Sequence, residues 1–68
     1  RIAGLLLESE HNGSVAITHE EIANTVGVSR VTVSKTLSRF AKSGYISTEY
    51  RRILIKSREG LEKLVNES

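Results

Sequence analysis

The sequence has no cysteine and no proline, and aromatic residues make up only 4% of its 68 residues. Without cysteine, the chain has no disulfide framework, no thiol nucleophile and no cysteine-based zinc site. The longest uninterrupted apolar run is Leu5–Leu7, whereas a membrane-spanning helix needs about 20 apolar residues. We expect no signal peptide here either, because Glu8 and Glu10 follow this run without a small-residue cleavage site. The composition therefore argues against a disulfide-rich class and against a membrane partner.

The sequence also lacks the motifs that carry common enzyme chemistry. It has no G-x-S-x-G motif and no phosphate-binding glycine loop. His11 and His19 are eight residues apart and have no third ligand at a recognisable spacing, so we interpret both as surface residues and expect no metal site. A chain of this length rarely builds a pocket with converging catalytic groups. We therefore expect no enzyme activity, no catalytic residue and no cofactor in this domain.

What the sequence does contain is a strongly uneven distribution of charge. Ten basic and eight acidic residues leave a net charge of only +2, but residues 1–29 carry −3, residues 30–58 carry +7 and residues 59–68 carry −2. A basic segment of this kind indicates a polyanionic partner such as nucleic acid. The alternative is a solvated face whose counter-charges come from the flanking segments after folding.

Apolar spacing and turn residues predict a mainly α fold with a small β-hairpin, in one domain over residues 1–68. The expected order is helix, strand, helix, turn, helix, hairpin, helix. The expected helices cover residues 1–10, 19–25, about 29–43 and the segment after Ser57, with a brief strand at 15–17 and a hairpin at about 45–56 whose turn is 49–51. The inner face of the last helix should consist of Leu61, Leu64 and Val65.

Residues 20–35 carry the strongest local pattern, which is that of a helix-turn-helix motif. Thr18 and Glu21 fit a capping box that starts its first helix. Gly27 suits the left-handed backbone that ends this helix, and Gly44 is expected to end the second helix in the same way.

The two helices of this motif should share a small apolar core. Ala23 is small where the second helix would cross the first. The residues expected to fill this core are Ile22, Val26, Val28 and Val33, and the buried stripe of the second helix should continue through Leu37, Phe40 and Ala41.

The opposite face of the second helix is polar and basic. At about 100° per residue, this face gathers Arg30, Val31, Ser34, Lys35 and Ser38. Arg30 lies in the first turn, where a cation opposes the helix dipole, and a DNA acceptor would account for a cation there. The alternative is an ordinary surface helix that carries Arg and Lys.

The expected hairpin adds two further cations. Arg51 and Arg52 lie at or beside its tip, which predicts a basic wing that contacts the phosphate backbone. The alternative is a solvated turn.

Ile17–Ala23 followed by Val26–Lys35 closely resembles the C-terminal DNA-binding domain of the cyclic-AMP receptor/fumarate-nitrate regulator (Crp/Fnr) family. The resemblance continues through Phe40 and Gly44–Ile46 into the final hairpin and helix, and so covers essentially the whole chain. It implies a winged helix-turn-helix domain that is attached, in a longer regulator, to an N-terminal sensor domain and a long dimerisation helix. We therefore expect residues 1–68 to be a C-terminal fragment of such a regulator.

The same resemblance implies sequence-specific binding to double-stranded DNA in bacterial transcription regulation. Its expected setting is the cytoplasm and the nucleoid, with a homodimer of the full-length protein on a near-palindromic operator and RNA polymerase as a further partner. The resemblance assigns no effector, because the sensing residues lie outside this chain. The alternatives are a winged helix of another regulator family and a winged helix used for protein–protein contact.

Residue roles follow from the resemblance by position. Family positions that match Arg30, Val31 and Lys35 reach base edges. Many members have Glu where Val31 stands and Arg where Lys35 stands. Valine cannot accept a hydrogen bond but can pack against a thymine methyl, and lysine lacks the guanidinium fork. We therefore expect this chain to read a different half-site from that of the best-known members.

The start of the second helix supplies the remaining contacts. Ser29 is expected to cap this helix, and family positions that match Ser29, Thr32 and Ser34 contact phosphate or base. The complete expected interface consists of Arg30, Val31, Ser34 and Lys35 for base reading, and of Ser29, Thr32, Ser38, Arg51 and Arg52 for the DNA backbone.

Overall fold

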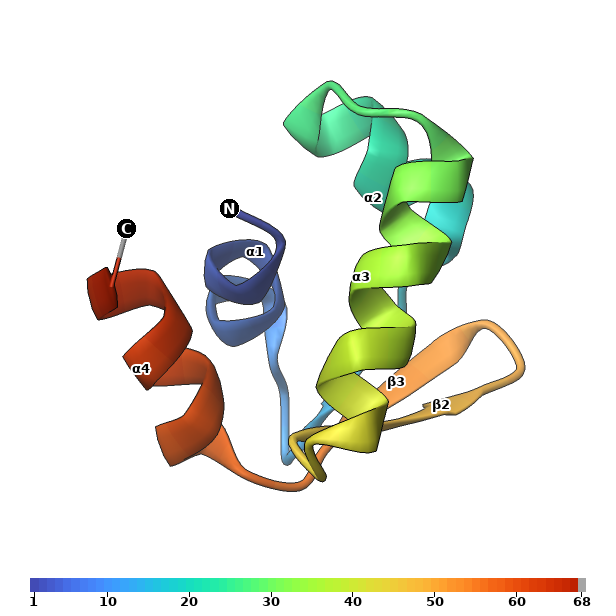
Figure 1. Cartoon of the computed structure of the whole chain (residues 1–68). Helices are drawn as coiled ribbons and strands as arrows, with labels where there is room; N and C mark the ends of the chain where they lie inside the picture. The colour runs from blue at the N-terminus through green and yellow to red at the C-terminus, as the bar shows by residue number, and fades with distance from the viewer. Residues whose placement is uncertain (68) are drawn as a thin grey trace.

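The computed structural model describes residues 1–67, and Ser68, the last residue of the expected domain, lies outside the described residues. Figure 1 shows α1 and α4 side by side, with the other helices beyond them and a hairpin projecting to one side. The expected mainly α winged helix-turn-helix with a small hairpin is confirmed. In chain order the elements are α1 (Ile2–Ser9), β1 (Ser14–Val15), α2 (His19–Val26), α3 (Arg30–Lys42), β2 (Ile46–Glu49), β3 (Arg52–Ile55) and α4 (Arg58–Glu67).

Local hydrogen bonds set both ends of α2 as the sequence predicts. Thr18 Oγ1 accepts from the backbone N–H of Glu21 at 3.2 Å, and the Glu21 carboxylate accepts from the backbone N–H of Thr18 at 2.8 Å. At the other end, Gly27 adopts φ 75° and ψ 38°, and its N–H donates to the Ala23 carbonyl at 2.9 Å. A residue with a β-carbon is strained in this left-handed conformation. The start of α2 therefore depends on the capping box, and the turn into α3 depends on Gly27.

The end of α3 uses a glycine in a different hydrogen-bond pattern. The helix stops at Lys42, Ser43 is the cap, and Gly44 follows with φ 80°. The backbone N–H of Gly44 donates to the Ala41 carbonyl and that of Tyr45 to the Phe40 carbonyl, both at 3.0 Å. This pair of bonds satisfies carbonyls that the helix end leaves without partners. The predicted role of Gly44 is confirmed, one residue beyond the cap.

Strand β3 is the central strand of a three-stranded antiparallel sheet with the order β1-β3-β2. The brief strand expected near Val15 begins one residue earlier and is shorter, because Val15 lies opposite Ile53 in β3. The Ile55 N–H also donates to the Gly13 carbonyl at 2.8 Å. Long-range pairing with β3 therefore decides which residues of the loop after α1 become a strand.

The β2–β3 hairpin has a two-residue tip. Glu49 pairs with Arg52, so only Tyr50 and Arg51 form the turn, and Glu49 belongs to β2 instead of the expected three-residue turn. Arg51 has φ 57°, and tight hairpin turns commonly need a positive φ at a central position. This geometry places the Tyr50 and Arg51 side chains at the most protruding point of the hairpin.

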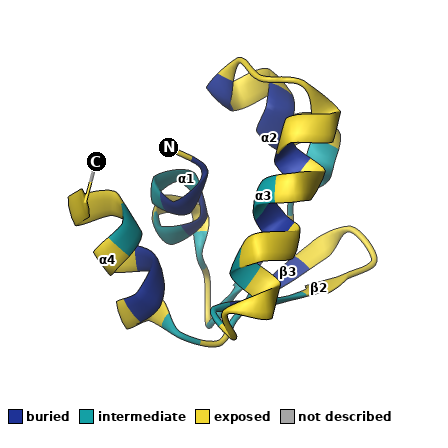
Figure 2. Ribbon diagram, viewed as in Figure 1, coloured by how far each residue is buried: buried dark blue, intermediate teal, exposed yellow. Residues whose placement is uncertain are grey.

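One buried cluster draws side chains from every helix and strand. Figure 2 shows dark blue segments on the inward faces of the helices, with the hairpin tip and the outer face of α3 exposed. Burying a large aliphatic side chain contributes about 1.5–3 kcal/mol. The largest fully buried side chains are Leu6, Ile22, Val33, Leu37, Ile53 and Leu61.

Three residues expected in the core are exposed. Val28 is 36% exposed, so its predicted place between α2 and α3 is wrong. It follows Gly27 in the turn, where helical spacing no longer determines the direction of a side chain. Ala41 and Val65 are also exposed, each at the edge of its helix's buried stripe, whereas Phe40 and Leu64 are half-buried against the core.

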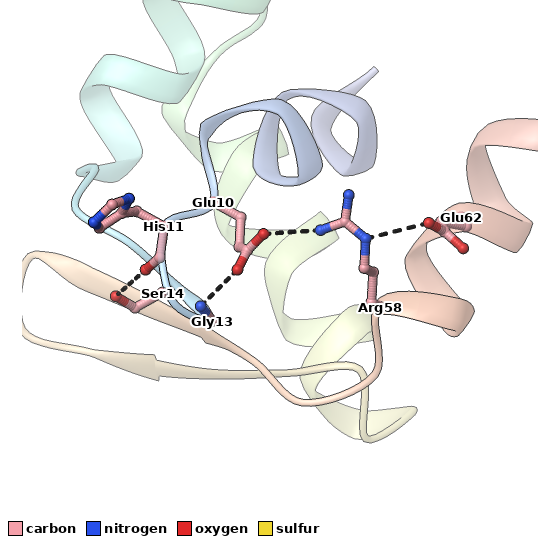
Figure 3. Close-up of polar contacts among 6 residues, drawn as sticks. All are labelled: Glu10, His11, Gly13, Ser14, Arg58 and Glu62. Atoms are coloured by element: carbon pink, nitrogen blue, oxygen red, sulfur yellow. Dashed lines mark hydrogen bonds and ion pairs between the residues drawn. The ribbon is translucent and has the colours of Figure 1, made fainter.

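The α1–α4 side of the molecule is held by a bridging arginine (Figure 3). The Arg58 guanidinium donates to the Glu10 carboxylate at 2.8 Å through Nη1 and to the Glu62 carboxylate at 3.3 Å through Nε. The second carboxylate oxygen of Glu10 accepts from the Gly13 backbone N–H at 2.6 Å. Arg58 thus joins the start of α4 to the loop after α1, although in the sequence it belongs to the basic segment 30–58.

Candidate nucleic-acid interface

The five residues expected on the outer face of α3 are brought together there by the structure. The side chains of Val33 and Leu37 on the same helix are fully buried and fix it to the core. Val31 is 63% exposed, so its methyl groups face the solvent. The exposed set is Arg30, Val31, Ser34, Lys35 and Ser38.

The basic face of α3 is longer than the set of interface residues predicted from the sequence. Arg39 and Lys42 line one hollow of about 450 Å³ together with Ser34, Lys35 and Ser38. Lys35, Arg39 and Lys42 are spaced at i, i+4 and i+7, which places them on one side of a helix. That spacing is visible in the sequence and could have identified Arg39 and Lys42 as further interface residues.

The start of α3 is organised by two hydroxyls. Ser29 Oγ accepts from the Thr32 backbone N–H at 3.1 Å, so Ser29 is the N-cap as predicted. The Ser29 hydroxyl donates to Thr32 Oγ1 at 3.0 Å. This arrangement directs the Thr32 hydroxyl proton away from Ser29, where an external oxygen can accept it.

The two arginines of the hairpin tip have different surroundings. Arg52 Nη2 lies 2.6 Å from the Glu49 carboxylate, which partly compensates its charge. The Arg51 guanidinium lies over the Tyr50 ring, 5.8 Å from its centroid. Tyr50 is 90% exposed, and no role was predicted for it from the sequence. The tip thus presents a cation and an aromatic ring together to the solvent.

A hollow of about 420 Å³ lies between the hairpin tip and the starts of α2 and α3. It brings Arg30 next to Arg51 and Arg52, which are at least 21 positions away in the sequence. His19 and Glu20 complete the α2 side of this hollow. Arg30, which is expected to contact bases, and the two arginines that are expected to contact the backbone therefore line the same hollow.

From the sequence, His19 was predicted only to be a surface residue. It is the first residue of α2, and its Nδ1 lies 3.1 Å from Ser34 Oγ on α3. No local pattern links two residues 15 positions apart, so only the packing of α2 against α3 reveals this contact.

The charge of Glu21 is coupled to the same region. Hydrogen bonds from the Thr18 backbone N–H and then from the Thr18 hydroxyl lower the pKa of the Glu21 carboxyl from its ordinary value of 4.5, and the charge of Arg51 acts in the same direction. The carboxylate is therefore held in its charged form at the start of α2, where it also interacts favourably with the helix dipole. Thr18 and Arg51 line the same hollow, so the hairpin tip lies near this end of α2.

Within residues 1–67 there is no group of three His, Asp or Glu side chains that could hold a metal ion. In the same part of the chain, no helix is both long enough and apolar enough to span a membrane. The exposed side chains of α3 and the hairpin tip offer guanidinium, ammonium, hydroxyl and methyl groups, which are suited to contacts with phosphates and base edges. The carboxylates of Glu20 and Glu49 also line the hollow beside the hairpin tip.

Comparisons with known proteins agree with this geometry. Residues 1–64 match the family of Crp-like helix-turn-helix domains. The CRP-like cAMP-activated global transcriptional regulator of Mycobacterium tuberculosis is 38% identical over 73 aligned positions, which cover 93% of this chain and 33% of that protein. The transcriptional regulator SdrP of Thermus thermophilus is 37% identical, over 94% of this chain and 36% of that protein.

A solved structure shows the same arrangement. A CRP/FNR-family transcriptional regulator from Thermus thermophilus superposes with a TM-score of 0.88 at 35% identity, over 97% of this chain and 39% of that chain. The chain spans about a third of the length of the curated relatives it matches. The resemblance is thereby confirmed, and the chain belongs to the Crp-like helix-turn-helix domain family.

Proposed function

We propose that this domain binds double-stranded DNA sequence-specifically by inserting α3 into the major groove. The observation that carries the proposal is the set of exposed basic and polar side chains on α3, a helix that is fixed to the core by the buried Val33 and Leu37. A recognition helix places the residues of its first turns at base edges. The proposed base-reading residues are Arg30, Val31, Ser34 and Lys35.

Each of these residues has a distinct chemical preference. Arg30 can donate two hydrogen bonds to guanine O6 and N7. Val31 offers only methyl groups, which suit the methyl of thymine. Lys35 donates as a compact charge without a fixed fork, so it discriminates less strictly than arginine. Together they favour a half-site that contains guanine next to thymine.

The remaining contacts are proposed to be made with phosphates. Thr32, whose hydroxyl proton points away from Ser29, is well placed to donate to a phosphate oxygen, and Arg51 supplies a positive charge at the hairpin tip. Phosphate contacts position the protein without reading sequence. The proposed set is Ser29, Thr32, Ser38, Arg51 and Arg52, extended by Arg39 and Lys42.

We further propose that this domain is the C-terminal part of a longer cytoplasmic regulator that acts at the nucleoid. Its curated relatives are about three times as long, which leaves room for a sensor domain and a dimerisation helix. A homodimer would place two copies of α3 on the halves of a near-palindromic operator. RNA polymerase is the proposed further partner, and the proposal includes no catalytic step.

Selection from a random pool of duplexes with the full-length protein tests this proposal. We expect enrichment of near-palindromic sequences whose half-sites lie about 34–36 Å apart, or a multiple of this distance. Lys35→Ala should relax the selected sequence at one position of each half-site. Lys63→Ala, a matched change of an exposed cation on α4, should leave the selected sequence unchanged.

Failure to enrich any duplex would contradict the proposal. Together with retained folding, it would favour the alternative in which the winged helix binds another protein.

A further inference from the structure

His19 and Ser34 form a hydrogen-bonded pair at the edge of the DNA-facing surface. Nδ1 of His19 lies 3.1 Å from Oγ of Ser34, and His19 is half-buried where α2 packs against α3. A hollow of about 310 Å³ beside this pair is lined by Ser38, Lys42 and Thr48, among others. The pair therefore joins a titratable side chain to one of the proposed base-reading hydroxyls.

The direction of this hydrogen bond depends on whether Nδ1 of the imidazole carries a proton. The direction changes on protonation when the neutral ring carries its proton on Nε2. When Nδ1 of a neutral imidazole carries no proton, it can only accept, so the Ser34 hydroxyl donates to it. The lone pairs of Oγ are then what Ser34 presents to the solvent. When the imidazole is doubly protonated, Nδ1 donates to Oγ, and the hydroxyl proton of Ser34 turns outward.

The two states of Ser34 suit different bases. A hydroxyl that presents only lone pairs can accept from the amino group of adenine or cytosine in the major groove. A hydroxyl that presents its proton can donate to O6 or N7 of guanine, to O4 of thymine or to N7 of adenine. We propose that His19 is a positioning residue that sets the hydrogen-bond direction of Ser34, so that base preference at this position depends on pH. This inference rests on the proposed insertion of α3 into the major groove.

Charged groups from three elements face His19. The hollows that His19 lines also contain Glu20 from α2, Arg30 and Lys42 from α3, and Glu49, Tyr50, Arg51 and Arg52 from the hairpin. Side chains of these other types ordinarily change charge below about pH 5 or above about pH 9, whereas histidine does so between about pH 5 and 8. A change of base preference within that range therefore points to a histidine, and the chain has only two.

The test compares dissociation constants at about pH 5.5 and about pH 8, inside the range in which histidine titrates. It uses the full-length protein, fluorescence anisotropy, and duplexes that differ at a single base pair of the selected site. The base pair opposite Ser34 is identified as the one whose discrimination Ser34→Ala removes. We expect the affinity ratio between donor and acceptor bases at this pair to change about two- to tenfold, the size of one hydrogen bond. Acidification should favour guanine or thymine over cytosine.

A uniform effect of charge must be separated from the change in preference. Protonated His19 adds a positive charge near the DNA, which should tighten binding to every duplex at low pH. Ser34→Ala should retain this uniform tightening but lose the pH-dependent ratio. His19→Gln should lose both, because glutamine can hydrogen-bond to Ser34 but does not titrate in this range. His11→Gln, a matched change in the loop after α1, should behave like the wild type.

A wild-type ratio that does not change with pH would overturn the inference, and so would a pH-dependent ratio that survives in His19→Gln. Circular dichroism at both pH values establishes that each protein is folded. Failure of the proposed function would look different, because no duplex would then be preferred at either pH.

Discussion

The two sides of the molecule use their arginines in opposite ways. On the α1–α4 side, Arg58 is bound between the carboxylates of Glu10 and Glu62. On the α3 side, no ion pair within residues 1–67 involves Arg30 or any other cation of that helix. The difference teaches that density of charge in the sequence does not identify an interface. An interface is identified by cations that the fold leaves uncompensated on a rigid element.

The hairpin contains one arginine of each kind. Arg52 is paired with Glu49, whereas Arg51 stacks on an exposed ring at the tip. Changes on the α3 side should therefore alter DNA binding and spare stability, and changes on the α1–α4 side should do the reverse.

Arg30→Ala should produce the largest loss of DNA binding. Removing a bidentate contact with guanine should cost about 1–3 kcal/mol on the preferred duplex and relax specificity at one base pair. The melting temperature should hardly change, because Arg30 is exposed. Fluorescence anisotropy on preferred and scrambled duplexes measures the effect. Equal losses on both duplexes would assign Arg30 to the backbone instead.

Gly60→Ala should have an effect of similar size, but on the free energy of unfolding instead of on DNA binding. A β-carbon at Gly60 would lie 2.4 Å from the Tyr45 ring, so the buried start of α4 would have to shift. Overpacking of this kind costs about 1–3 kcal/mol of unfolding free energy, which urea denaturation measures. The folded fraction should bind DNA with unchanged affinity.

Gly4→Ala is the matched control for this change. A β-carbon at Gly4 would make only an ordinary contact, 3.9 Å from Val65, so the higher helix propensity of alanine should stabilise α1 by about 0.5–1 kcal/mol. If both variants were equally stable, the close packing of Tyr45 on α4 would be in doubt.

Arg51→Ala and Arg58→Ala give a direct comparison of the two sides. Arg51→Ala should reduce the slope of log affinity against log salt by about 0.9, the value for one phosphate contact. Arg58→Ala should leave this slope unchanged and lower the unfolding free energy by less than about 1 kcal/mol, as is usual for exposed ion pairs. Arg52→Ala should fall between them. A slope that changed more for Arg58→Ala than for Arg51→Ala would reverse our assignment of the two sides.

Removing the charge of the Glu21 carboxyl should have the smallest effect, which is a pH-dependent change in stability. Because its pKa is lowered in the folded state, its contribution to stability is fully present above the unfolded pKa. That contribution is lost as the pH falls through the lowered folded pKa. Glu21→Gln keeps an acceptor for the Thr18 N–H but removes the charge. Melting curves should therefore separate the two proteins near neutral pH and converge below about pH 4.

The helix-turn-helix could be predicted because its signals are local. Thr18 caps α2 through a residue three positions away, Ser29 does the same for α3, and Gly27 needs only its own backbone conformation. Helical spacing also placed Val33 and Leu37 in the core. The same spacing predicted the exposed face of α3, including Arg30.

Three other features could not be predicted in this way. Val28 lies in a turn, where no period applies, and is exposed. The β1 strand depends on pairing with β3, about 40 positions away in the sequence. The hydrogen bond between His19 and Ser34 exists only because α2 packs on α3. For β1 and for the bond between His19 and Ser34 the partner is remote in the sequence, and for Val28 no helical period applies, so no short stretch of sequence contains the information.

The sequence alone was sufficient to predict the local elements of this protein and to identify its family, because helix caps, glycines and apolar spacing act over a few residues. The tertiary structure decided which charges are available to a partner. Arg58 and Arg30 each follow a serine at the start of a helix, yet within residues 1–67 Arg58 is paired with two carboxylates and Arg30 forms no ion pair. The physical reason is that compensation of a charge depends on distance in space, and folding alone brings Glu10, 48 positions away, to within 2.8 Å of Arg58.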